Sequence, residues 1–275
     1  MSAAVPYLRP LPTPPWPRRV WLKLGWNLAL AVEVVAVVVL WELLVGVLRL
    51  TNPEFFPPPS AIGSAFKAIT SSGVLGENIA FSVRNFVIGY AIAAVVGIAI
   101  GLTMGTSPRL SLALSPFVWT FYSTPRVAIA PLLVLWLGFG AESKIAMVAL
   151  MAVFPILVNV MVGGQNVDQT LLRAGRVFGA SRLDLYRKVV LPFTLPYTIT
   201  GLRLGIGRGL IGIVIGEFIG SSAGLGLMIL RAASQFDLAT TFAVLLVLLV
   251  MANASMVLLD AARARIAPWY RETTF

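Results

Sequence analysis

Residues 168–195, DQTLLRAGRVFGASRLDLYRKVVLPFTL, lie between two apolar stretches of this chain, residues 144–163 and 195–219. The segment is far longer than a turn, and its mixture of charged and apolar residues indicates a structure of its own. Its apolar residues suit two short helices that meet at Gly179, with Pro192 ending the second helix. A projecting helical hairpin of this length is too short to span lipid and is suited to docking a partner.

The rest of the sequence is that of a membrane protein. Of the 275 residues, 58% are apolar and 12% charged, against about 45–50% and about 25% in soluble domains. We predict an all-α polytopic protein with a single transmembrane domain at residues 27–262 and tails at 1–26 and 263–275. Its six expected spans are residues 27–47, 84–105, 112–138, 144–163, 195–219 and 239–259.

Two further features refine this prediction. Ser60 is expected to N-cap an amphipathic interfacial helix that reaches Ile79. Three prolines within residues 112–138 predict that this span is kinked or broken, and broken helices typically line cavities; they are Pro116, Pro125 and Pro131.

The basic residues predict the orientation. Most of the 21 Lys and Arg residues fall in the first tail, in residues 168–195 and in the last tail. By the positive-inside rule both termini and the 168–195 segment are cytoplasmic. The net charge of +10 is therefore attributed to membrane insertion, and no nucleic-acid partner is expected. No small-residue cleavage site follows the first apolar stretch, so we expect it to be retained.

Glycines recur at four-residue spacing in two of the expected spans, which predicts that other helices pack closely against them. They are Gly97, Gly101 and Gly105 in one span, and Gly201, Gly205 and Gly209 followed by Gly212, Gly216 and Gly220 in the other. The G-x-G-x-x-G at Gly207, Gly209 and Gly212 has no preceding strand, so helix packing is the favoured interpretation. No Gly-Lys-Ser or Gly-Lys-Thr occurs, so any ATP must be bound by another subunit.

The residue types exclude most enzymes. Without Cys or His the chain has no thiolate metal site, disulfide or imidazole acid–base group, and we expect no cofactor, metal or catalytic centre. A membrane-embedded enzyme would need clustered acids, whereas the 11 acids are scattered. An ion-driven secondary transporter would show internal repeats, and none is convincing. Both classes are kept as alternatives.

Charged residues within the spans are costly and predict function. Candidate residues of a translocation pathway are Arg126, Trp136, Arg203, Arg208 and Glu217. For the charged residues the alternative is snorkelling or an interhelical partner, and for Trp136 it is an interfacial aromatic. Arg126 lies between two prolines of a broken span, where freed backbone groups and a cation could together meet a small anion.

Motifs across the chain resemble the permease subunits of binding-protein-dependent ABC importers, specifically the nitrate/sulfonate/taurine branch. The cytoplasmic signature of that family is Glu-Ala-Ala, three residues, Gly, nine residues, then Ile, any residue and Leu-Pro. Here its spacing is kept by Arg173-Ala174-Gly175, Gly179, Val189 and Leu191-Pro192. Arg173 replaces the Glu and Gly175 the second Ala. Further matches include Trp41-Glu42, residues 125–128, 138–140 and 201–203, and Gly224-Leu225-Gly226, over about residues 35–266.

The resemblance implies a type I importer fold in the prokaryotic inner membrane. Two such subunits, expected to be identical copies, would pair, bind two ATPase subunits and receive a solute from an extracytoplasmic binding protein. The solute would be a small anion such as nitrate, a sulfonate or taurine, or alternatively a neutral or aromatic vitamin precursor. The ATPase-docking residues would be Arg173, Ala174, Gly175, Gly179, Ala180, Ser181, Val189, Leu191 and Pro192.

Overall fold

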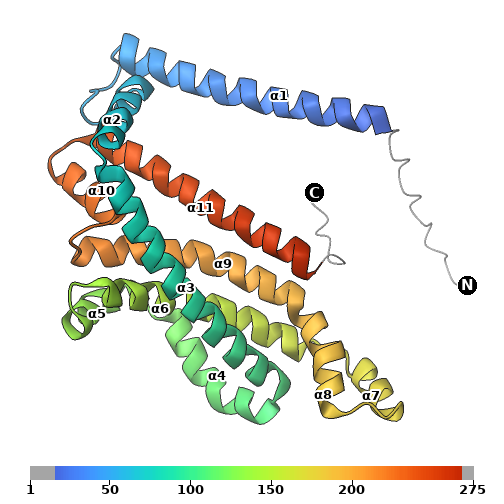
Figure 1. The fold of residues 1–275 in the computed structure, drawn as a ribbon. Helices are drawn as coiled ribbons and strands as arrows, with labels where there is room; N and C mark the ends of the chain where they lie inside the picture. Colours follow the sequence, from blue (N-terminus) through green and yellow to red (C-terminus); the bar gives the residue numbers. More distant parts are fainter. Residues whose placement is uncertain (1–15, 268–275) are drawn as a thin grey trace, which may run out of the picture. The chain divides into compact units, whose positions relative to one another are not determined.

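The computed structural model describes residues 16–267, with side chains from residue 28, and the described chain is helical with no strand (Figure 1). This confirms the all-α prediction. By its internal contacts the chain divides into two compact units, one ending at Ala61 and the other beginning at Ile62.

The first unit contains helix α1 (Trp16–Trp41), which continues into a π-helical turn, η1 (Glu42–Val47). The helix thus begins within the predicted tail, of which residues 1–15 lie outside the described residues. Glu42 accepts hydrogen bonds from the backbone N–H and the hydroxyl of Ser60, at 2.9 and 2.8 Å. Ser60 is therefore not an N-cap: the helix begins at Pro59, and Glu42 supplies the negative group that a helix N-terminus favours.

The second unit begins within α2 (Pro59–Ser71), which is followed by α3 (Val74–Thr106). Gly73, with φ of +75°, separates the two helices, because a left-handed residue stops a helix. The predicted boundaries at Ile79 and Arg84 are therefore wrong. Next come α4 (Pro108–Ser123), the 3₁₀ turn η2 (Arg126–Ile129) and α5 (Ala130–Leu137). The chain bends by 85° between α4 and the η2–α5 pair, which confirms the predicted break.

Helix α6 (Ala141–Gln165) packs against both α3 and α9 (Leu191–Ile219), and these three helices form the core of the second unit (Figure 1). Glycines permit the close approach. A Cβ added at Gly101 of α3 would lie 2.7 Å from the Leu157 carbonyl oxygen, and one at Gly212 of α9 would lie 3.0 Å from that of Met147. The predicted close packing on these glycines is confirmed.

The remaining elements are α7 (Gln169–Val177), α8 (Arg182–Leu185), the π-helical turn η3 (Tyr186–Val190), α10 (Leu225–Ser234) and α11 (Leu238–Ile266). Helix α11 continues past the predicted start of the last tail, of which residues 268–275 lie outside the described residues. Helices α7 and α8 project beyond the ends of α6 and α9 (Figure 1).

Four described helical segments are long and apolar enough to cross a membrane, or five if the bent α4–α5 region counts as one span. They are Leu28–Val47, Val74–Thr106, Ala141–Gln165 and Leu238–Ile266. Helix α9, which carries Arg203, Arg208 and Glu217, is not among them although it has 29 residues. The count of six spans therefore stays a prediction.

We expect Gly101→Ala to destabilise the protein, because the new methyl group would overlap the backbone of α6. Overpacking of this kind typically costs about 1–3 kcal/mol. The measurement is thermal unfolding of the purified chain in detergent, followed by size-exclusion chromatography. Gly76→Ala in the same helix is the matched control, because no atom lies within 4 Å of its Cβ position. Equal unfolding temperatures for both variants would contradict the close α3–α6 packing.

Candidate functional site

Helices α7 and α8 form a capped hairpin. Asp168 caps α7 by accepting a hydrogen bond from the Thr170 N–H at 2.7 Å, and Ser181 caps α8 by accepting one from the Asp184 N–H at 3.1 Å. Between them Gly179 has φ of +79°, a conformation that L-residues with side chains rarely adopt. The prediction of two short helices that meet at Gly179 is confirmed.

The second arm of the hairpin does not end at Pro192. Helices α8, η3 and α9 follow one another without a break from Arg182 to Ile219. Pro192 lies in the first turn of α9, directly after the wider π-helical turn of η3. Pro192 has no N–H to donate, yet the helix continues through it directly after the wider π-helical turn, so the prediction that Pro192 terminates the helix is wrong.

The salt bridge within α8 and η3 reinforces this arm. Lys188 Nζ lies 2.8 Å from Asp184 Oδ1, and Ser181 also donates a hydrogen bond to this carboxylate. These two partners lower the pKa of Asp184 to about 2. Because the lowered pKa belongs to the folded state, the stabilisation is present at neutral pH and is lost only as the pH falls towards 2.

The nine predicted docking residues differ in exposure. Gly175 is half-buried, and a Cβ at this position would lie 2.5 Å from Leu185 Cδ2, so glycine permits α7 and α8 to touch. Gly179 has open space around it. Glycine is therefore needed at this position for the backbone conformation and not for lack of space. The exposed members are Arg173, Ala174, Gly179, Ser181 and Leu191, and the half-buried members are Gly175, Ala180, Val189 and Pro192.

The largest exposed apolar side chains of the hairpin were missed as site residues. Val177 and Phe178, at the tip, are 85% and 89% exposed, and Leu171 and Leu183 are 51% and 57% exposed. We refer to these four residues as the tip surface. Their apolar character was visible in the sequence, but it was attributed to helix formation, because periodicity alone does not say which side of a hairpin remains uncovered.

Arg126 lies at the bend between α4 and α5 and is only 9% exposed. Its guanidinium stacks on Tyr122 and Phe154, with centroid distances of 5.6 and 5.1 Å. Its Nη1 has no hydrogen-bond partner among the described residues. The like charge of Arg208 on α9 acts on it, so these two predicted pathway residues lie within electrostatic range of each other. An adjacent hollow of about 610 Å³ is lined by Trp119, Thr120, Ser123, Thr124 and Pro125.

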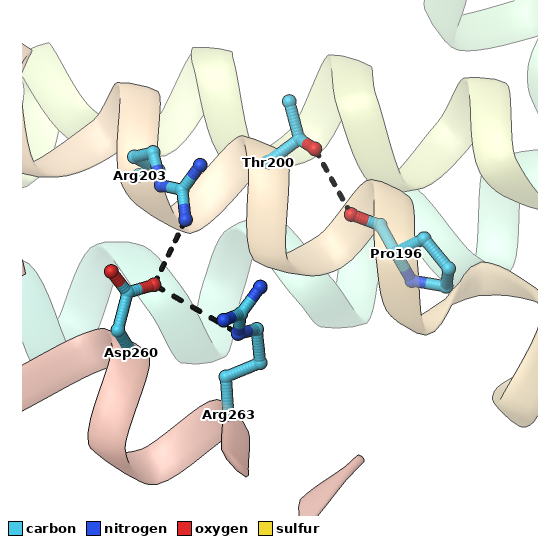
Figure 2. Close-up of polar contacts among 5 residues, drawn as sticks. All are labelled: Pro196, Thr200, Arg203, Asp260 and Arg263. Carbon is cyan, nitrogen blue, oxygen red and sulfur yellow. Dashed lines mark hydrogen bonds and ion pairs between the residues drawn. The ribbon is translucent and has the colours of Figure 1, made fainter. Parts of the chain in front are cut away.

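Arg203 has a different environment. Its Nη2 lies 2.8 Å from Oδ1 of Asp260 on α11, and Arg263 Nε lies 3.9 Å from the same oxygen (Figure 2). One turn away on α9, the Thr200 hydroxyl donates to the Pro196 carbonyl (Figure 2). Arg203 therefore joins α9 to α11, whereas Trp136 on α5 is 71% exposed.

Glu217 is 1% exposed and holds the turn that leads into α10. Its carboxylate accepts hydrogen bonds from the Ser82 hydroxyl and the Gly226 N–H, both at 2.7 Å. Ser82 in turn accepts from the Leu225 N–H at 2.9 Å, and Asn78 accepts from the Gly224 N–H at 2.6 Å. The free N–H groups at the start of α10 are thus bound by side chains of α3 and α9.

Lys144 of α6 holds the other end of the same turn. Its ammonium is fully buried and donates to the carbonyls of Phe139 and Gly220 and to the Ser143 hydroxyl. The opposite charges of Lys144 and Glu217 act on each other. We refer to Asn78, Ser82, Lys144 and Glu217 as the turn clamp. Lys144 was not among the residues predicted from the sequence to form a site.

Comparisons with known proteins identify the family of this chain. Residues 93–272 match the family of binding-protein-dependent transport system inner membrane components. The putative aliphatic sulfonates transport permease protein SsuC of Bacillus subtilis is 31% identical over 89% of this chain and 88% of its own length. The taurine transport system permease protein TauC of Escherichia coli is 31% identical over 91% and 94%.

Solved structures give the same fold. A chain of the MetNI methionine ABC transporter in an inward-facing conformation aligns with 70% of this chain and 96% of its own length, with a TM-score of 0.61 and 19% identity. The family match and the named relatives define a membrane transport permease rather than an enzyme. This chain belongs to the family of inner-membrane components of binding-protein-dependent transport systems, with a type I ABC permease fold. The predicted resemblance is confirmed.

We expect Glu217→Ala to destabilise the protein, because it leaves the Ser82 hydroxyl and the Gly226 N–H without their buried acceptor. Leaving a buried donor unsatisfied typically costs about 1–3 kcal/mol. Thermal unfolding in detergent measures the effect, and Glu77→Ala, an exposed glutamate of α3, is the control. If both variants unfold at the wild-type temperature, the turn clamp contributes no stability.

Proposed function

We propose that this permease is the pore subunit of an ATP-driven importer and that the tip surface docks its ATPase. The observation that carries the proposal is the exposure of Val177 and Phe178 on a capped helical hairpin. Large apolar side chains exposed together outside a membrane span typically mark a protein–protein contact. An aromatic side chain at the tip is the kind of anchor that supplies much of the binding energy of an interface.

The continuous α8–η3–α9 helix gives the docking hairpin a mechanical function. A displacement of the hairpin would pass directly into α9, since no loop intervenes between Arg182 and Ile219. Helix α9 carries Arg208, whose charge acts on Arg126, and its far end carries Glu217 of the turn clamp. When ATP drives closure of the ATPase subunits, the resulting rigid-body movement of the helix would thereby be transmitted to the solute path and to the opposite end of α9.

The solute that this geometry favours is a small anion. Arg126 and Arg208 place two cations within electrostatic range of each other, and Arg126 is buried with an unpaired Nη1. A buried donor without a partner is costly, and an anion in transit would satisfy it. The named solutes of the sulfonate and taurine permeases agree, and a nitrate import permease protein, NrtB, of Leptolyngbya laminosa is 34% identical over 58% of this chain.

An aromatic solute is the second candidate. Arg126 is stacked between the rings of Tyr122 and Phe154, and the adjacent hollow is lined by Trp119. Such surroundings suit a planar ring. The riboflavin transport system permease protein RibX of Chloroflexus aurantiacus is 30% identical over 88% of this chain and 90% of its own length.

The assembly that we propose contains two copies of this chain, two ATPase subunits and an extracytoplasmic binding protein. Both termini and the α7–α8 hairpin lie on the cytoplasmic side in this arrangement, as the distribution of Lys and Arg favours. Two further residues stay proposed members of the translocation pathway. They are Arg203, which is bound to Asp260, and Trp136, which is exposed.

We predict that Phe178→Ser weakens association with the ATPase by at least about tenfold, because an aromatic anchor typically contributes more than 1.4 kcal/mol. The measurement is copurification of the tagged permease with its ATPase, with uptake recorded in parallel. Phe236→Ser, which changes another highly exposed phenylalanine outside the hairpin, is the control. Full copurification of Phe178→Ser would refute docking at the tip surface.

Uptake into vesicles that contain the assembled importer distinguishes the two candidate solutes. We expect Arg126→Gln and Arg208→Gln each to lower taurine or nitrate uptake while ATPase copurification is unchanged, because each removes a cation from the path. Arg84→Gln, at an exposed arginine of α3, should transport normally. Unchanged anion uptake in both variants would make these arginines structural, and uptake of riboflavin alone by the wild type would support the aromatic solute.

A further inference from the structure

A cavity of about 950 Å³ lies between the α7–α8 hairpin and the adjoining ends of α3, α4 and α6. This volume lies within the range of small-molecule binding sites, at about 300–1,000 Å³. None of the predicted pathway residues lines it. It is therefore separate from the site around Arg126.

Helix α7 presents two different faces. Gln169, Leu172 and Arg176, spaced by three and four residues along the helix, line the cavity. The tip residues Val177 and Phe178 do not line it and are almost fully exposed. A ligand in the cavity and an ATPase on the tip surface would therefore contact different sides of the hairpin.

The lining of the cavity is cationic and amphiphilic. It contains two arginines, Arg176 and Arg182, together with neutral polar groups, and it contains no carboxylate. The nearby acids are already engaged, since Asp168 accepts from Thr170 N–H and Asp184 pairs with Lys188. Apolar side chains form the rest of the lining: Met104, Leu112, Val167, Leu172, Leu185 and Val190.

We propose that this cavity binds an amphiphilic anion, with a sulfonate, carboxylate or phosphate head on the two arginines and an apolar body against the apolar lining. The volume is far larger than an inorganic anion needs, and the apolar lining favours a hydrocarbon body. The head chemistry is shared by soluble organic anions and by anionic lipids of the adjacent membrane leaflet. This inference rests on the proposed function in one respect only: the proposed function places the cavity on the side of the membrane where the ATPase docks.

Binding here would link the hairpin to the membrane core. Gln165 at the end of α6 donates to the Ser111 hydroxyl of α4 at 3.0 Å, so the α4 and α6 walls of the cavity are joined to each other. Within the described part of the chain, no hydrogen bond or ion pair joins the wall formed by α7 and α8 to α4 or α6, and few contacts connect them. A ligand held by Arg176 and Arg182 would bridge the two walls and restrain movement of the hairpin.

The absence of cysteine from the sequence permits a direct test on the full chain. Gln169→Cys places one thiol on the cavity wall, and Phe178→Cys places one on the tip surface as the control. Each variant is reconstituted in nanodiscs of phosphatidylcholine, and the rate of alkylation by a maleimide is measured with and without hexanesulfonate. A second set of nanodiscs contains phosphatidylglycerol in place of part of the phosphatidylcholine.

We expect an anion to slow alkylation of the cavity thiol and to leave the tip thiol unaffected. Arg176→Gln together with Arg182→Gln should weaken this protection by at least about tenfold, since hydrogen bonds to charged groups are lost. Arg173→Gln, on the same helix but outside the lining, should leave protection unchanged.

Protection by hexanesulfonate in phosphatidylcholine identifies a soluble organic anion as a ligand, and protection by phosphatidylglycerol alone identifies a lipid. Absence of protection by both, or protection that survives loss of both arginines, overturns the proposal. Neither result depends on ATPase copurification. A failure of the proposed ligand site can therefore be distinguished from a failure of the proposed ATPase docking at the tip surface.

Discussion

The close approach of α3 and α9 to α6 is the constraint on which the rest of the second unit depends. At Gly101 and Gly212 the backbone of α6 occupies the space that a side chain would need. Where glycine leaves no side chain at the contact, the backbones of the two helices touch directly. In lipid, dispersion contacts rather than burial of apolar surface then hold the helices together. The same packing positions Arg208, the turn clamp and the α8–η3–α9 helix relative to one another.

Buried charges then have two distinct uses in this permease. Lys144 and Glu217 are saturated by hydrogen bonds, and they hold the turn before α10 to three helices. Arg126 is buried but keeps an unpaired Nη1, and the like charge of Arg208 acts on it. A satisfied buried charge stabilises the fold, whereas an unsatisfied one is a cost that a ligand can offset. Whether a buried charge has all its hydrogen-bond partners, and not charge alone, therefore separates the candidate structural residues from the candidate pathway residues.

The sequence predicted the helical class, the break in residues 112–138, the glycine contacts and the hairpin at Gly179, because each follows from local chemistry. It did not predict that Pro192 lies inside a continuous helix, since the π-helical turn before it has no sequence signature in this chain. The turn clamp was also missed, because Ser82 and Glu217 are 135 residues apart and only the packed fold brings them together. Exposure of the tip surface likewise depends on which side of the hairpin the core covers.

The central claim is that the hairpin and α9 move as one body. Spin labels on the double variant Arg182→Cys and Leu204→Cys, at exposed positions of the continuous helix on either side of η3, permit a pulsed electron paramagnetic resonance distance measurement in the assembled importer. The account predicts the same narrow distance distribution with and without bound ATP. A shift or a marked broadening on ATP binding would place a hinge in η3 and contradict it.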